Sequence, residues 1–178
     1  MVSKKIVMKL KITFKNQSRL MWFHLIGTLL MIFTLFFFEF NQKIMIVFLV
    51  FWMLYTIPAL YLHLEYYFKN VGQELRIMED EIRFRDKDQK ELTWKFHDLQ
   101  KIILYKSASL DRGGVQLSAI ESYHYARIIP KQGSEIIVTC LMTPNVEEEV
   151  KKIRGVKFER KKRLFASLNI SLRLLPDK

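Results

Sequence analysis

The chain has 178 residues, of which 50% are hydrophobic and 13% aromatic, and its formal net charge is +11 at pH 7. The single cysteine, Cys140, excludes a fold held by intramolecular disulfide bonds, and it agrees with a reducing compartment. The positive charge lies at both ends, whereas residues 65–150 contain 12 basic and 15 acidic side chains. Because this central part is mildly acidic, nucleic acid is not an expected partner.

The first 19 residues predict a basic cytoplasmic arm, and residues 155–178 predict a basic tail. The arm carries six basic side chains and no acidic one. Such segments next to a bilayer are attracted to anionic lipids. We therefore expect a basic group of residues to contact the membrane surface. This group consists of Lys4, Lys5, Lys9, Lys11, Lys15, Arg19, Lys161, Lys162 and Arg163.

Two apolar runs without a charged side chain follow the arm, at residues 20–38 and 44–64, and only residues 39–43 separate them. A bilayer core about 30 Å thick needs roughly 20 helical residues, because a helix rises about 1.5 Å per residue. In lipid, such runs must form helices, since every backbone polar group needs a partner. We therefore predict two transmembrane helices joined by a tight external loop.

The distribution of basic residues predicts the orientation of these helices. Loops rich in Lys and Arg stay in the cytoplasm, so the arm is expected there, and two spans return the rest of the chain to the same side. We therefore expect a multi-pass protein of a cytoplasmic membrane, bacterial in type, with both termini in the cytoplasm.

Polar residues within the spans are the candidates for contacts there. Pro58 is expected to kink the second span, and Thr56 can help to satisfy the backbone groups that the kink frees. Together with Trp52 and Tyr55, these residues would form a contact face for another membrane protein. His24 lies near the cytoplasmic end of the first span, where we expect an interfacial or interhelical hydrogen bond. The spans contain no Asp, Glu, Lys or Arg, which argues against an ion or proton pathway.

The remaining chain predicts a linker at residues 65–72 and one small domain at residues 73–154. Apolar residues alternate over 73–79, 81–86 and 92–96, as in half-buried strands. One helical turn is expected at 97–100, a short strand at 102–105 and a weak strand at 115–117. A hairpin of 123–129 with 135–141 follows, and then a helix after Thr143 that Asn145 can cap. The pattern of residues 164–175 fits a strand and a helix equally well.

Three segments of this domain resemble the pleckstrin-homology-like (PH-like) fold of bacterial membrane proteins. They are residues 94–102 (WKFHDLQKI), residues 123–129 (YHYARII) and residues 135–141 with the helix after them. The resemblance covers roughly residues 1–154, and the step Ile129-Pro130-Lys131 is similar to the YcxB-like pattern. It implies two transmembrane helices followed by a small antiparallel PH-like β-barrel or sandwich with a C-terminal helix, an α+β fold.

No catalytic, cofactor or metal site is expected from the sequence. The four histidines lack metal-ligand spacing, and Cys140 reads as an inert buried thiol. Arg83 and Arg85 are part of a lipid-binding PH pattern, but the acidic turn at residues 79–81 would repel a phosphate, so a solvated strand face is preferred.

These observations favour a non-enzymatic, membrane-anchored interaction or scaffolding module on the cytoplasmic face, which binds a protein partner or further copies of itself. Two alternatives stay open at this point. One is an accessory subunit that acts through its transmembrane helices within a larger complex. The other is a sensor of anionic lipid surfaces that uses its basic ends.

Overall fold

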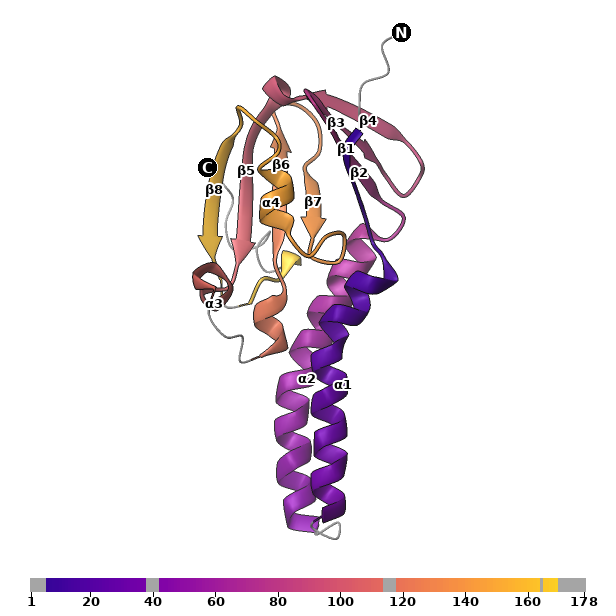
Figure 1. Ribbon diagram of the computed structural model, residues 1–178, viewed down its shortest axis with the longest axis vertical. Helices are drawn as coiled ribbons and strands as arrows, with labels where there is room; N and C mark the ends of the chain where they lie inside the picture. Colours follow the sequence, from indigo (N-terminus) through magenta and orange to yellow (C-terminus); the bar gives the residue numbers. More distant parts are fainter. Residues whose placement is uncertain (1–5, 38–41, 114–117, 164, 170–178) are drawn as a thin grey trace.

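The computed structural model describes residues 6–37, 42–113, 118–163 and 165–169. Its helices and strands form a domain of two sheets, from which a long pair of helices projects (Figure 1). In chain order the elements are β1 (Ile6–Lys11), α1 (Phe14–Phe37), α2 (Gln42–Asn70), β2 (Glu74–Met78), β3 (Glu81–Arg85), β4 (Glu91–Lys95), the short 3₁₀ helix η1 (Phe96–Asp98), β5 (Leu99–Lys106), α3 (Ala108–Arg112), the 3₁₀ helix η2 (Ala119–Ser122), β6 (Tyr125–Pro130), β7 (Ile136–Thr139), α4 (Val146–Val150) and β8 (Lys157–Lys162).

The helix pair α1–α2 is inserted between two neighbouring strands of one sheet. The first sheet has the order β1-β2-β3-β4, and all its described pairs are antiparallel. Leu10 of β1 lies opposite Leu75 of β2, and both side chains are buried. The helices therefore leave the sheet after β1 and return to it at β2, so both ends of the pair are fixed by the same strand ladder.

The second sheet has the order β7-β6-β5-β8 and supplies more buried core residues than the first sheet does. Its strands β5 and β7 are almost continuously buried, as expected where both faces of a sheet are covered. Helix α4 packs against β6, and the second half of α2 approaches β7 (Figure 1). This sheet is mixed, because β8 runs parallel to β5.

The expected barrel is corrected in two respects. The described strands form two open sheets rather than a closed barrel, and one pair is parallel. The parallel pair arises from the predicted basic tail, in which Lys157–Lys162 adds an edge strand to β5. A strand with the sequence KFERKK has no regular apolar alternation, so its pattern resembles a solvated segment.

The boundaries near the helices also differ from those expected. Residues 6–11 of the predicted arm form β1, and α1 begins at Phe14 instead of residue 20. Helix α2 continues past residue 64 through most of the predicted linker and ends at Asn70. The reason is tertiary packing, since Tyr66 and Asn70 are fully buried against the domain.

The other expected elements occur with shifted ends. The strands at 73–79, 81–86 and 92–96, the helical turn near residue 97 and the hairpin at 123–141 correspond to β2, β3, β4, η1 and β6–β7. The helix after Thr143 is short, and Asn145 donates to Glu148 instead of capping it with its side chain. The expected strand at 115–117 lies outside the described residues, as do residues 164 and 170–175 of the ambiguous segment.

Candidate functional site

The projecting part of the helix pair exposes apolar side chains over most of its length. Phe33, Leu29 and Leu54 have exposed fractions of 68%, 65% and 64%. Both helices are long and apolar enough to cross a membrane, by length and composition alone, and only 6% of the apolar window of each is buried. Helices in the core of a water-soluble protein would be buried instead.

The second half of α2 changes character and enters the domain. Leu62 and Tyr66 are fully buried there. The Tyr66 hydroxyl donates to the carbonyl of Ala166 at 2.6 Å, and its ring makes edge contacts with Tyr123 and Tyr125. Asn70 closes the helix with a 2.8 Å bond from its side-chain amide to the carbonyl of Ile137 in β7. Helix and sheet therefore share one core.

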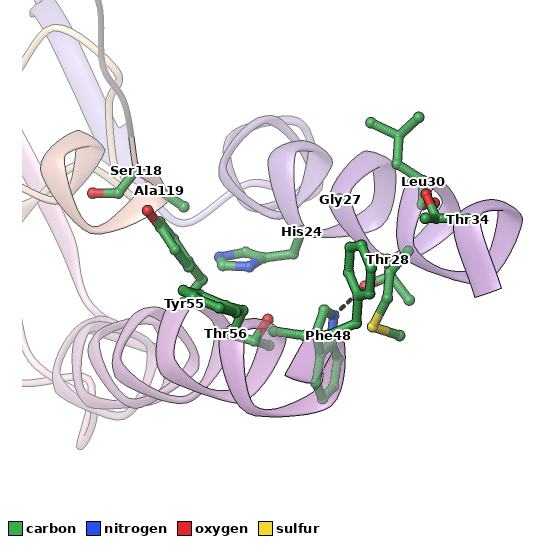
Figure 2. A pocket seen from close by; sticks show the side chains of 13 residues that line it. His24, Gly27, Thr28, Leu30, Thr34, Phe48, Tyr55, Thr56, Ser118 and Ala119 are labelled. Atoms are coloured by element: carbon green, nitrogen blue, oxygen red, sulfur yellow. Dashed lines mark hydrogen bonds between the residues drawn. The ribbon is translucent and has the colours of Figure 1, made fainter. Parts of the chain in front are cut away.

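A cavity of about 370 Å³ lies where α1, α2 and the 3₁₀ helix η2 meet. Figure 2 shows His24 between the two long helices, with Tyr55 beside it and Ser118 and Ala119 at the end nearest the domain. The complete lining is His24, Gly27, Thr28, Leu30, Met31, Thr34, Phe48, Phe51, Trp52, Tyr55, Thr56, Ser118 and Ala119.

Two features keep this cavity open. The indole N–H of Trp52 donates to the hydroxyl of Thr28 at 2.9 Å, which links the helices across its wall (Figure 2). Gly27 has no atom within 4 Å of the place where a Cβ would lie, so the space beside it is empty.

Nε2 of His24 is buried and has no hydrogen-bond partner among the described residues. The expected hydrogen bond of His24 is therefore not made by this nitrogen within the described chain.

Three of the four residues predicted to contact another membrane protein line this cavity, namely Trp52, Tyr55 and Thr56. Trp52 and Thr56 face α1, and Trp52 uses its only polar group on Thr28. Pro58 lies inside α2, which continues through it. Gly27, Thr28 and Ser118 were missed at the sequence level. The signal for the α1 residues was a stripe of spacing three and four, running from Leu20 through His24 and Gly27 to Met31 and Thr34.

A charge network occupies the end of the domain near α3. Lys106 Nζ lies 2.9 Å from Asp111 Oδ1 and 2.7 Å from Glu147 Oε2, and Lys162 Nζ lies 3.1 Å from Asp111. Hydrogen bonds from Lys106 and Lys162 lower the pKa of Asp111 to about 2. Burial acts to raise the pKa of Glu147, but its bonds from Lys106, Lys151 and Arg160 outweigh this and lower it to about 2. The network joins β5, α3, α4 and β8.

Two kinds of reactive group, a metal cluster and a thiolate, can be judged from the described part of the chain. No group of three or more His, Cys, Asp or Glu side chains there could hold a metal ion. Burial raises the pKa of the Cys140 thiol to about 12, so it is protonated at neutral pH and is a poor nucleophile.

A family model described as a PH domain matches residues 6–151. The chain belongs to this PH-domain family. The match begins at the first residue of β1 and extends just past α4, so the helix pair lies inside the region that defines the family. Comparison with characterised proteins and with solved structures gave no match. PH domains generally act as non-catalytic modules that bind lipids or proteins.

The arginines of this PH domain that bear part of a lipid-binding pattern are paired within their own sheet. Arg83 contacts Glu81 at 2.8 Å, and Arg85 lies 3.8 Å from Glu91. Both acidic partners lie in the same sheet, Glu81 in β3 and Glu91 in β4. This arrangement is that of a solvated strand face rather than a phosphate site.

The basic residues predicted to contact the membrane have different neighbours where the structure describes them. Lys9 of β1 pairs with Glu74 at 2.9 Å, whereas Lys15 and Arg19 are exposed at the start of α1. In β8, Lys162 belongs to the charge network. Near the end of β8, Lys161 Nζ lies 5.9 Å and Arg163 Cζ 5.3 Å from the centroid of the Tyr105 ring. Lys11 is the last residue of β1. Lys4 and Lys5 lie outside the described residues.

Proposed function

We propose that this protein is a membrane-anchored interaction module without catalytic activity. In this proposal α1 and α2 cross the bilayer as a hairpin and hold the PH domain against the cytoplasmic surface. The observation that carries it is the insertion of an exposed, apolar helix pair between two paired strands of the domain. Such an anchor sets the height and orientation of the domain as well as its location.

The surface of the helix pair supports the bilayer part of this proposal. The exposed apolar side chains would cost free energy in water, at roughly 25 cal/mol per Å² of apolar surface, and lipid removes that cost. Lys15 and Arg19 lie at the start of α1, and β8 runs toward the end of the domain from which the helices project (Figure 1). Basic residues at these places suit anionic lipid head groups on the cytoplasmic side.

The shared core supports the scaffolding part. Because Tyr66 and Asn70 join α2 to the second sheet, the domain cannot turn freely on its anchor. A fixed orientation presents the same face of the domain to the cytoplasm in every copy. This property favours recognition of another protein over simple tethering.

The surface best suited to a protein partner is the edge of the first sheet. Among the described strands β4 pairs with β3 alone, and an edge strand can accept a strand from a partner. Beside it lies a cleft of about 680 Å³, which Trp94, Asp98 and the turn at residues 131–134 line. The indole N–H of Trp94 donates to the carbonyl of Gln132 at 3.4 Å. A large aromatic side chain in a cleft is typical of binding hot spots.

Site-specific photocrosslinking in intact cells tests this proposal. A photoreactive amino acid in place of Thr93, in the middle of the edge strand β4, is expected to capture a discrete protein partner or a second copy of the chain. The matched control carries the same amino acid at exposed Lys157 of β8, where we expect no discrete product. Equal, diffuse labelling at both positions, or no capture at Thr93, would contradict an interaction role for this edge.

A further inference from the structure

The cavity between α1, α2 and η2 is not used by the proposed anchoring or by the proposed binding edge at β4. We infer that it holds one acyl chain of a membrane phospholipid, with the ester region of that lipid beside His24. This inference rests on the proposed function, because the lipid enters from the bilayer around the hairpin.

The lining changes from polar to apolar along the cavity. His24, Tyr55 and Ser118 lie at the end next to the domain (Figure 2). Met31 and Phe48 lie further along the helices, toward the hairpin tip. The hydroxyl of Thr34 at that end is already used, since it donates to the carbonyl of Leu30 at 2.8 Å. Apart from Thr34 and the Thr28–Trp52 pair, the polar side chains of the lining therefore lie toward the domain, which suits a molecule with a polar head and an apolar tail.

The direction of this gradient agrees with the orientation of lipids in the cytoplasmic leaflet. His24 and Met31 are separated by seven residues of α1, or about 10 Å along the axis, at a rise of about 1.5 Å per residue. With the domain on the cytoplasmic side, His24 lies near the head-group level and Met31 lies deeper in the hydrocarbon. A lipid of that leaflet would need no inversion to fit.

The opening of the cavity indicates where a ligand would come from. Leu30, Phe51 and Tyr55 line the cavity and have exposed fractions of 61%, 59% and 55%, so we take them as its mouth. These side chains belong to the same apolar surface that covers the rest of the hairpin, so the mouth opens onto lipid. A volume of about 370 Å³ lies in the usual range of small-molecule sites, roughly 300–1,000 Å³.

His24 supplies the specific contact. Its Nε2 is buried without a described partner, and a polar group in an apolar environment is costly unless it is hydrogen-bonded. An ester carbonyl of a phospholipid would accept a hydrogen bond from this nitrogen in its protonated tautomer. The same contact would leave the tail free to follow Gly27 and Met31 toward the hairpin tip.

The test uses the full-length protein in vesicles of phosphatidylethanolamine that carry a diazirine within one acyl chain. After illumination, labelled residues are located by mass spectrometry. We expect labels on the cavity-facing positions Gly27, Met31 and Phe48 to exceed, several-fold, those on the outward positions Leu29, Phe33 and Leu54. The variant Gly27→Leu fills the empty space and should remove this excess, and Met31→Trp should do so independently. The matched control Leu29→Phe adds bulk to the outward face of α1 and should leave the excess unchanged.

Several results would overturn the inference. Equal labelling of inward and outward positions would show that the cavity takes no ordered chain, and so would an excess that persists in both filled variants. A cross-link from the cavity to a second copy of the chain would replace the lipid with a protein. Alkaline carbonate extraction of the same samples separates the two proposals. Protein that stays in the membrane with equal labelling refutes only the lipid site, whereas protein released by carbonate refutes the anchor as well.

Discussion

Lys106 lies at the centre of an ion-pair network that joins four elements of the domain. Its ammonium group lies between Asp111 of α3 and Glu147 of α4, and Lys162 of β8 contacts the same Asp111. These pairings could not be predicted from sequence, because Glu147 and Lys162 are far from their partners in the chain, and Lys106 and Asp111 lie in different elements. Lys162 was expected at the membrane surface, but its contact with Asp111 fixes the edge strand β8.

Acid should weaken this network. The pKa values of Asp111 and Glu147 in the folded protein, about 2, lie below their ordinary values of 3.8 and 4.5. A lowered folded pKa stabilises the protein above the ordinary value and ceases to do so as the pH falls toward 2. We therefore expect the thermal midpoint of the detergent-solubilised protein to fall between pH 5 and pH 2.

Lys106→Met should lower stability at pH 7 by about 1 kcal/mol and flatten this profile. An unchanged profile in the variant would show that Lys106 does not control it.

The hydrogen bond from Trp52 to Thr28 is a direct contact between α1 and α2. Trp52→Phe keeps an aromatic ring but removes the donor, so the Thr28 hydroxyl loses its partner. Interhelical hydrogen bonds in membranes contribute about 0.6 kcal/mol on average and about 1.7 kcal/mol at most. We expect a loss of this size in unfolding titrations with sodium dodecyl sulfate. Trp22→Phe, at a ring with an exposed fraction of 60%, is the control and should have a smaller effect.

At the scale of elements, α2 serves two environments in one helix. Its first half exposes apolar side chains, and its second half is buried by residues that recur every three or four positions, such as Leu62, Tyr66 and Asn70. Hydropathy predicts the first half well, because length and absence of charge are sufficient there. It could not predict that the second half enters a domain core, since that depends on Tyr123 and Tyr125, about sixty residues later.

Removing the Tyr66 side chain should therefore weaken the packing between the helix pair and the domain. Tyr66→Ala deletes a fully buried ring and its bond to Ala166, and such truncations cost about 3–5 kcal/mol. We expect a large fall in the thermal midpoint and cleavage by protease near residue 70. Phe68→Ala, two residues later at an exposed ring, should change neither by a comparable amount. Equal effects of the two substitutions would argue against a shared core.

The strands show which signals are readable in a sequence. β2, β3 and β4 alternate apolar and polar residues and were predicted close to their true bounds. β1 alternates as well, with Leu10 buried between the exposed Lys9 and Lys11, but the basic charge and the apolar run after it favoured an arm. The spacing of the α1 lining residues is visible in the sequence, but the cavity itself could not be predicted, because it forms where η2 meets two helices that lie far from it in sequence.

At the scale of the whole molecule, the PH domain and its hairpin are one unit. The chain begins a sheet at β1, leaves it for the length of two helices, and returns to it at β2. The family match covers this whole path. A truncated chain that lacks residues 1–11 should therefore keep its hairpin but lose the pairing of β1 with β2, and we expect it to accumulate poorly in cells. Accumulation equal to that of the intact chain would contradict this view.

The sidedness of the hairpin is the most direct test of the central claim, that α1 and α2 cross the bilayer with the domain in the cytoplasm. The native thiol gives little background, because Cys140 is buried. A membrane-impermeant maleimide is applied to sealed right-side-out and inside-out vesicles that contain Gln42→Cys, at the hairpin tip, or Lys157→Cys, on β8. We predict that Gln42→Cys reacts only in right-side-out vesicles and Lys157→Cys only in inside-out vesicles. Reaction of both positions from the same side would contradict the account.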